Sequence, residues 1–375
     1  MSSHLIENVP NYFDPIVNDC FSNALGSYIL YKDLDPNIVM ADYLSFIYDE
    51  EDNSMGINYL FKSYDTVIFT EEQLNVSLHF FYNSEIYTYD SKLHNNRNVR
   101  KDKINLFKYV SDKEKSYERM KELINQDKPV IAAIDLYYAK YHPAYMKKHG
   151  LHYIVITGYD ESLGEYEVID RYKLTNSDFE GRLSINEINN GRNSSNPLSD
   201  PIKGDYERPI QNTWTEVEIG EDFEVTSDDI LAIIKESIVR MKGEKKVLGL
   251  NCGINMIKKC KENIECVKTV ELNENILFTF KSYYNYIFKV IARNRKRFGA
   301  FIGSSNKCFV IDNSNNIIEL LNLSAEKWDI CANLSYKFGL CKKARVIDDI
   351  SSKFDEIIQL ETEIVNLLEK CIMDN

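Results

Sequence analysis

Cysteine is nearly absent from the first two thirds of this chain. Cys20 is the only one before Cys252, and the remaining seven of the eight cysteines lie at or beyond Cys252 without forming a Cys-x-x-Cys pair. This spacing argues against a zinc ribbon or a thioredoxin-type site, and it predicts free thiols in a reducing compartment. The later seven fall in helical or apolar patterns that suit small core residues. Cys20 stands apart, and we interpret it as a candidate nucleophile.

Long apolar runs and an excess of basic residues are also missing. No run approaches the roughly 18 apolar residues that a membrane helix needs, and the opening residues 1–8 lack the basic and apolar regions of a signal peptide. The chain has 45 Lys and Arg against 58 Asp and Glu, a net charge of −13. We therefore expect a cytoplasmic protein that neither crosses a membrane nor binds nucleic acid. No metal or bound cofactor is expected, and the sequence leaves the oligomeric state open.

Charge and periodicity divide the chain at residue 225. Residues 1–224 contain 22 basic and 38 acidic residues, a net charge of −16, whereas residues 225–375 contain 23 and 20, a net charge of +3. The first part mixes helical and strand patterns, and the second part is helical in period throughout. With 375 residues there is room for two domains with substantial cores. The prediction is an α+β domain over 1–224 followed by an all-α domain over 225–375.

Particular elements follow from the same patterns. In the first domain we expect helices starting at Cys20, at 36–48 and at 113–126, and a mobile loop at 189–201, where Asn, Ser, Gly and Pro gather. The expected strands are 67–69, 76–81, 86–89, 129–137, 152–159, 165–172 and 213–219. In the second domain the expected helices are 230–241, 249–262, 273–297, 324–338 and 347–372.

Cys20 lies where a proline-bounded loop turns into a helix. Ala24, Leu25, Tyr28 and Ile29 have the spacing of a buried helical stripe. The residues before the cysteine, Asn18 and Asp19, are ordinary capping residues. A thiolate at the first turn of a helix is stabilised by unpaired backbone N–H groups and by the positive end of the helix dipole. The same amides could hold an oxyanion.

A thiolate nucleophile needs a base, and the base needs an acceptor that orients it. Of the six histidines, His152 opens a β-branched run that reads as a buried strand, and 165–171 alternates like its hairpin partner. Asp170, the last acidic residue of that partner strand, is therefore expected near His152. We predict a triad of Cys20, His152 and Asp170, whose chain order and 132-residue cysteine-to-histidine separation suit papain-like enzymes.

Further motifs carry a resemblance to a known family. A strand ending in Asp135-Leu136-Tyr137-Tyr138 precedes the histidine strand, and Cys20, Ser22 and Ala24 form a Cys-x-Ser-x-Ala helix start. In these features residues 10–175 resemble the butirosin biosynthesis protein H family. A papain-like enzyme of closthioamide assembly, which forms an amide to a diamine, is similar as well.

The resemblance implies a papain-like catalytic domain with a helical extension. It implies an acyltransferase that takes an acyl group from the phosphopantetheine thioester of a carrier protein and passes it to a small amine. The partners would be that carrier protein and the amine, and the phosphopantetheine arm would be the acyl donor. As substrate-binding residues, we expect Tyr137 and Tyr138 to line the cleft and His149 to lie at its mouth. Papain-like hydrolases usually have an oxyanion-binding glutamine about six residues before the cysteine; here that residue is Asp14, and Asn18 is the nearest amide side chain.

Several alternatives remain open at this stage. The same triad would serve a papain-like peptidase or a thioester hydrolase, and an inert Cys20 would leave a scaffold subunit of an assembly line. His142, His149 and His152 could suggest a metal, but no carboxylate or cysteine completes a recognisable spacing. A basic helix end at Arg293, Arg295, Lys296 and Arg297 either complements the helix dipole or docks an acidic carrier protein.

Overall fold

The computed structural model describes residues 2–14, 16, 19–57, 60–62, 67–68, 79–94, 96–172, 177–197, 209–247, 249–307 and 309–373. The chain forms two compact units. Unit 1 consists of Met1–Pro36 and Phe80–Glu224, and unit 2 consists of Asn37–His79 and Val225–Asn375. One boundary lies at 224/225, where the sequence analysis put it. Residues 37–79, which that analysis assigned to the first domain, are instead part of unit 2.

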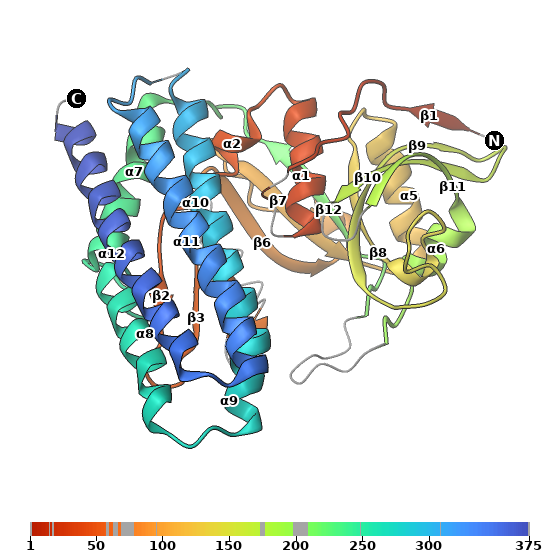
Figure 1. The fold of residues 1–375 in the computed structure, drawn as a ribbon. Helices are drawn as coiled ribbons and strands as arrows, with labels where there is room; N and C mark the ends of the chain where they lie inside the picture. The colour runs from red at the N-terminus through yellow and green to blue at the C-terminus, as the bar shows by residue number, and fades with distance from the viewer. Residues whose placement is uncertain are drawn as a thin grey trace. The chain divides into compact units, whose positions relative to one another are not determined.

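Unit 1 is built on an eight-stranded sheet (Figure 1). Its order is β11-β10-β9-β8-β12-β7-β6, with β1 paired to β9, and only the β6/β7 pair is parallel. The central strands are almost fully buried, because continuous apolar runs such as Val130–Asp135 have both faces covered. The strands are β1 Ser3–Leu5, β6 Phe81–Thr88, β7 Ile104–Val110, β8 Val130–Asp135, β9 Leu151–Asp160, β10 Glu165–Tyr172, β11 Ser177–Ser184 and β12 Trp214–Ile219.

Helices cover both faces of this sheet. The first helix, α1 (Cys20–Tyr31), packs against β9 and β10, and its Phe21 ring meets the Tyr153 ring edge-on at 5.1 Å. On the other face α5 (Lys113–Ile124) contributes Leu123 to the core that contains Ile154. Helix α6 (Ile185–Arg192) joins the same core, and α4 (Ser91–His94) and the 3-10 turn η1 (Leu136–Tyr138) complete the unit. Unit 1 is therefore an α+β body with helices on both faces of its sheet.

Unit 2 is mainly helical. Its long helices α10 (Asn285–Ser305), α11 (Ser314–Cys341) and α12 (Ala344–Met373) run side by side (Figure 1). The other helical elements are α7 Ser227–Lys242, α8 Ile254–Cys266, η3 Val267–Thr269, α9 Glu274–Phe278 and the π-helical η4 Thr279–Tyr284, and α2 (Pro36–Val39) lies at the boundary of the units. Residues 37–79 add a small sheet of β2 Ile47–Tyr48, β3 Met55–Ile57, β4 Leu60–Lys62 and β5 Val67–Ile68.

A buried ion pair holds the helices of unit 2 together. Arg295 of α10 and Glu361 of α12 are fully buried, and Arg295 Nη2 lies 2.7 Å from Glu361 Oε2. Trp328 of α11 donates its indole N–H to Glu361 Oε1 at 2.9 Å. Arg295 also donates to the Ser45 carbonyl at 2.6 Å, which ties residues 37–79 to the helices. Within the described residues, no helix is long and apolar enough to cross a membrane.

Several sequence predictions are wrong in detail. A helix was expected at 36–48, but the structure has only the four-residue α2 there, followed by irregular chain and β2. The apolar residues of this segment are buried on all sides, whereas a surface helix buries only one stripe. The loop expected at 189–201 begins inside α6. The strands β7 and β11 were not predicted, and the residues expected to form a strand at 76–78 lie outside the described part of the chain.

Candidate active site

Cys20 is the first residue of α1, as the sequence predicted. Asp19 caps the helix with extended backbone angles (φ −145°, ψ 159°), accepting the Ser22 N–H at 2.7 Å and the Ser22 hydroxyl at 2.8 Å. This cap uses one of the free amides of the first turn. The amides of Cys20 and Phe21 remain as the donors that this turn can direct at a group bound beside the sulfur. The thiol itself is half-buried and not in a disulfide.

His152 and Asp170 form a buried pair on adjacent strands. The imidazole Nε2 lies 3.0 Å and 2.9 Å from the two carboxylate oxygens of Asp170, and the exposed fractions of the two residues are 1% and 5%. The Cys20 thiol is also close enough to His152 to act on the pKa of its imidazole. Since Nε2 faces Asp170, Nδ1 is the ring nitrogen left for the thiol. The three residues predicted from sequence thus lie together in the order thiol, imidazole, carboxylate.

A β-bulge brings His152 and Asp170 to the same face of the sheet. The first register pairs Asp160 to Gly158 of β9 with Glu165 to Glu167 of β10. The next pair is Ile156 with Val168, so Thr157 has no partner on β10 and forms the bulge. After the bulge, Val155 pairs with Ile169, which sets Asp170 diagonally across from His152. Without the extra residue the register would differ by one, and the two side chains would point to opposite faces.

Electrostatics keep the buried pair ionised. Burial lowers the pKa of His152, but the charges of Asp170 and Cys20 and their hydrogen bonds outweigh it and raise this pKa from 6.5 to about 10. For Asp170, burial acts to raise the pKa, and the His152 imidazolium with donors from His152, Tyr141 and Ser177 brings it below its usual 3.8. The imidazole therefore carries a proton at neutral pH, between a carboxylate and a sulfur.

Tyr141 is a member of this cluster that the sequence analysis did not identify. Its hydroxyl donates to Asp170 Oδ2 at 2.7 Å, and its ring stacks on Phe179 of β11 at 4.3 Å. Burial and the neighbouring Asp170 charge raise its pKa well above 10, so it stays a hydrogen-bond donor. The sequence gives only weak evidence for this role, because Tyr141 is one of several aromatic residues in a segment rich in Tyr and His.

The three residues expected to bind substrate form a second cluster. The His149 ring stacks on Tyr137 at 4.3 Å, and Tyr138 meets Tyr137 edge-on at 5.2 Å. His149 Nδ1 lies 2.6 Å from Asp135 Oδ2, and this fully buried carboxylate also accepts the Ser194 hydroxyl at 2.6 Å. All three aromatic side chains are half-buried. Their role in binding a substrate stays a prediction.

The side chain that would complete an oxyanion site is not identified. Asn18, the candidate from sequence, lies outside the described residues. Asp14, at the position of the usual glutamine, is buried and accepts the Ile16 N–H at 2.7 Å. Asn23 is committed to the backbone, because its amide nitrogen donates to the Tyr12 carbonyl at 2.9 Å and to the Arg171 carbonyl. Within the described chain, only the backbone amides at the α1 start are therefore proposed as oxyanion donors.

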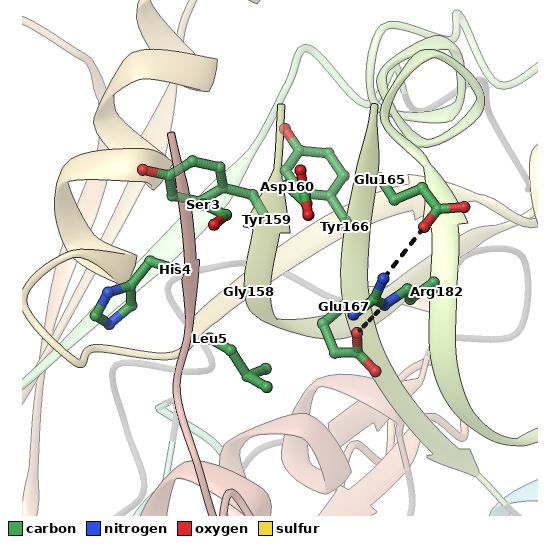
Figure 2. A pocket seen from close by; sticks show the side chains of 10 residues that line it. All are labelled: Ser3, His4, Leu5, Gly158, Tyr159, Asp160, Glu165, Tyr166, Glu167 and Arg182. Atoms are coloured by element: carbon green, nitrogen blue, oxygen red, sulfur yellow. Dashed lines mark hydrogen bonds and ion pairs between the residues drawn. The ribbon is translucent and has the colours of Figure 1, made fainter. Parts of the chain in front are cut away.

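A separate pocket of about 330 Å³ lies at the opposite ends of β9 and β10. Figure 2 shows its lining, in which Arg182 reaches toward both Glu165 and Glu167. Its walls come from β1, β9, β10 and β11, and none of Cys20, His152 and Asp170 contributes to it. We place the candidate site at the triad, because a nucleophile, a base and an acceptor meet there. Among the described residues no group of three or more His, Cys, Asp or Glu side chains could hold a metal ion.

Comparison with protein families supports the resemblance seen in the sequence. Residues 66–171 match the family described as Butirosin biosynthesis protein H, N-terminal. Over that segment the chain is similar to this family. The butirosin biosynthesis protein H match contains His152, Asp170 and Tyr141, whereas Cys20 lies before it. No curated protein matches the chain, so the likeness to the closthioamide enzyme stays a prediction.

Proposed function

We propose that this protein is a papain-like, cysteine-dependent acyltransferase of antibiotic or other secondary-metabolite biosynthesis. It would move an acyl or peptidyl group from a carrier-protein phosphopantetheine thioester, through an acyl-Cys20 intermediate, to an amine. The observation that carries the proposal is the line from the Cys20 thiol through the His152 imidazole to the Asp170 carboxylate. The family match supports the biosynthetic setting, since its name refers to butirosin biosynthesis.

In the first step, Cys20 Sγ attacks the thioester carbonyl carbon as a thiolate. The new bond is the Sγ–C bond, and the bond that breaks joins the carbonyl carbon to the pantetheine sulfur. The His152 imidazolium gives its proton to the leaving sulfur. The backbone N–H groups of Cys20 and Phe21 are aimed at the oxyanion. Asp170 holds the imidazole in the orientation that presents Nδ1 to the sulfur.

In the second step, an amine attacks the acyl-Cys20 carbonyl carbon. Nitrogen forms the amide bond, Sγ leaves as the thiolate, and the amine proton passes to His152. Acylation removes the Cys20 contribution that raises the pKa of His152, so the neutral imidazole, the form that can accept the amine proton, is favoured at this stage. Because the amide is more stable than the thioester, the transfer runs toward product.

The acidic character of residues 1–224 suits a cationic acceptor. Their net charge of −16 would raise the local concentration of an ammonium compound such as a diamine or an aminoglycoside. The same charge also keeps a protein soluble, so it supports the class of acceptor and does not select one molecule.

Intact mass spectrometry with an acyl-loaded carrier protein tests this proposal. We expect one acyl adduct on the wild-type chain, its loss in Cys20→Ala, and its discharge to an amide when a diamine is added. Discharge by water alone, without amine, would identify a hydrolase. The absence of any adduct, with Cys20 also inert to stoichiometric iodoacetamide at mildly acidic pH, would favour a scaffold without catalytic activity.

A further inference from the structure

The segment between η1 and β9, residues 139–150, differs in charge from the rest of unit 1. From residue 136 to residue 159 there is no Asp or Glu, whereas Lys and His each occur three times. Residues 1–224 as a whole carry a net charge of −16. We refer to residues 139–150 as the basic loop. Its charge is opposite to that of its surroundings, which is the pattern expected of a surface that selects an anionic partner.

Internal hydrogen bonds brace the basic loop. The Met146 N–H donates to the Tyr137 carbonyl at 2.9 Å, and the Lys147 and Lys148 N–H groups donate to the Ala144 carbonyl at 2.9 Å and 3.1 Å. His142 is buried and accepts the Ala144 N–H on Nδ1 at 3.0 Å. These contacts fix the backbone that carries the exposed side chains, so the surface is preorganised for binding.

An apolar side chain is presented at the tip of this loop. Met146 has a left-handed backbone with φ +51°, which is strained for a residue with a side chain, and it is 63% exposed. Pro143, Lys147 and Lys148 are exposed beside it. An exposed methionine flanked by lysines combines an adaptable apolar contact with a cationic rim.

The basic loop is attached to the triad. Tyr141, near its start, donates to Asp170, and Lys148, near its end, is four residues before His152. His149 is anchored to buried Asp135. A macromolecule that binds this loop would therefore be held next to the site where its acyl group reacts.

We propose that Pro143, Met146, Lys147 and Lys148 form the docking surface for an acidic carrier protein. The lysines attract the acidic carrier and the phosphate of its phosphopantetheine arm, and Met146 packs against its apolar surface. The same charges would repel a cationic amine acceptor. This inference rests on the proposed function, because it names the face through which the acyl donor arrives.

The test compares two donors that differ only in the carrier. One is an acyl-loaded carrier protein, and the other is the same acyl group on N-acetylcysteamine, a small thioester that lacks carrier and phosphate. We expect Lys147→Glu/Lys148→Glu to slow acylation of Cys20 by the carrier about tenfold or more at low salt, and to weaken its dependence on salt. Acylation by the small thioester stays unchanged. Met146→Ser, which removes the apolar contact without adding charge, should slow the carrier reaction as well, without changing its salt dependence.

The matched control is Lys258→Glu/Lys259→Glu, which makes the same charge change at two adjacent exposed lysines of α8. It should leave both reactions at the wild-type rate. An unchanged carrier reaction in the basic-loop variant would overturn the docking surface, and so would an equal loss with both donors, which would indicate damage to the triad. If the wild type is acylated by neither donor, the proposed function fails instead.

Discussion

At the scale of single residues, the proton on His152 is the central feature. The imidazole is buried beside the Asp170 carboxylate and the Cys20 sulfur, whose influence outweighs burial and raises its pKa to about 10. An imidazolium is the form that can protonate a departing thiolate, so the ionised pair is the resting state suited to acylation. The largest influence that raises this pKa is the charge of Asp170, whose carboxylate accepts a hydrogen bond from Tyr141.

The first prediction concerns the pH dependence of acylation. We expect the rate of Cys20 acylation by a thioester to fall as pH rises through about 10, because the imidazolium loses its proton there. Asp170→Asn removes the largest contribution that raises this pKa and should move the fall to lower pH by roughly one to three units. Rapid-quench mass spectrometry across the pH range measures both profiles. Identical profiles would mean that Asp170 does not control the imidazole.

The same pair predicts how stability depends on pH. The folded pKa of His152 is raised above 6.5, so its contribution is complete below pH 6.5 and is lost as pH rises through about 10. The folded pKa of Asp170 is lowered, so its contribution is present above pH 3.8 and is lost at lower pH. Trp214 is the only tryptophan of unit 1 and Trp328 the only one of unit 2. Urea unfolding followed by Trp214 fluorescence, in Trp328→Phe, should show a loss of stability between pH 7 and about 10.5 that Asp170→Asn reduces.

Tyr141→Phe tests the residue that the sequence analysis missed. The substitution keeps the ring on Phe179 and removes one hydrogen bond to an ionised carboxylate, an interaction of about 1.5–3 kcal/mol. We expect acylation to slow by about tenfold, since about 1.4 kcal/mol corresponds to that factor. Tyr145→Phe on the same loop is the control and should retain the wild-type rate. Equal rates in the two variants would show that the Tyr141 hydroxyl has no part in orienting Asp170.

At the scale of elements, the first turn of α1 determines where the thiol lies. Asp19 holds this turn, and Asp112 holds the first turn of α5 in the same way, accepting the Lys115 N–H at 2.8 Å. Each of Asp19→Ala and Asp112→Ala should cost about 1 kcal/mol of stability in unit 1, read from Trp214 fluorescence. Only Asp19→Ala should also slow acylation. A comparable slowing in Asp112→Ala would mean that the effect is general loosening and not displacement of Cys20.

Much of this site could be predicted from sequence because its elements have strong local patterns. The Cys20 helix has a cap and a buried stripe, and the β9/β10 hairpin has β-branched runs on either side of a short turn, so all three appear close to their expected bounds. The bulge at Thr157 could not be predicted, since register depends on the partner strand. β7 was missed because its run Ile104–Val110 includes Asn105 and Lys108 and becomes a buried strand only between β6 and β12.

The basic helix end is an example of a prediction that burial decides. Arg295 was considered as part of a docking surface, but it is fully buried against Glu361, and Lys296 lies 2.9 Å from Asp329. The sequence shows which residues of α10 are charged, but it does not show which face of the helix is buried. That face is determined by packing with α11 and α12. These two residues therefore serve unit 2 and are not part of a cationic surface.

At the scale of the molecule, that buried pair is expected to be sensitive to substitution. Arg295→Ala leaves Glu361 as a buried charge without its guanidinium, and we expect a loss of about 3–5 kcal/mol. Urea unfolding followed by Trp328 fluorescence, in a Trp214→Phe background, measures this loss in the free energy of unfolding. Lys268→Ala, which removes an exposed ion pair with Asp348, should cost less than about 1 kcal/mol. Similar losses in the two variants would contradict the assignment of Arg295 and Glu361 as the core of unit 2.

The discontinuous arrangement of the units also sets an order of events during protein synthesis. Cys20 belongs to unit 1, yet His152 is made 132 residues later, after the ribosome has already produced residues 37–79 of the other unit. At about 5–20 residues per second, this interval is on the order of 10 s. Throughout it the nascent thiol has no imidazole beside it. The thiol gains this partner only when the strands that carry His152 and Asp170 have been made.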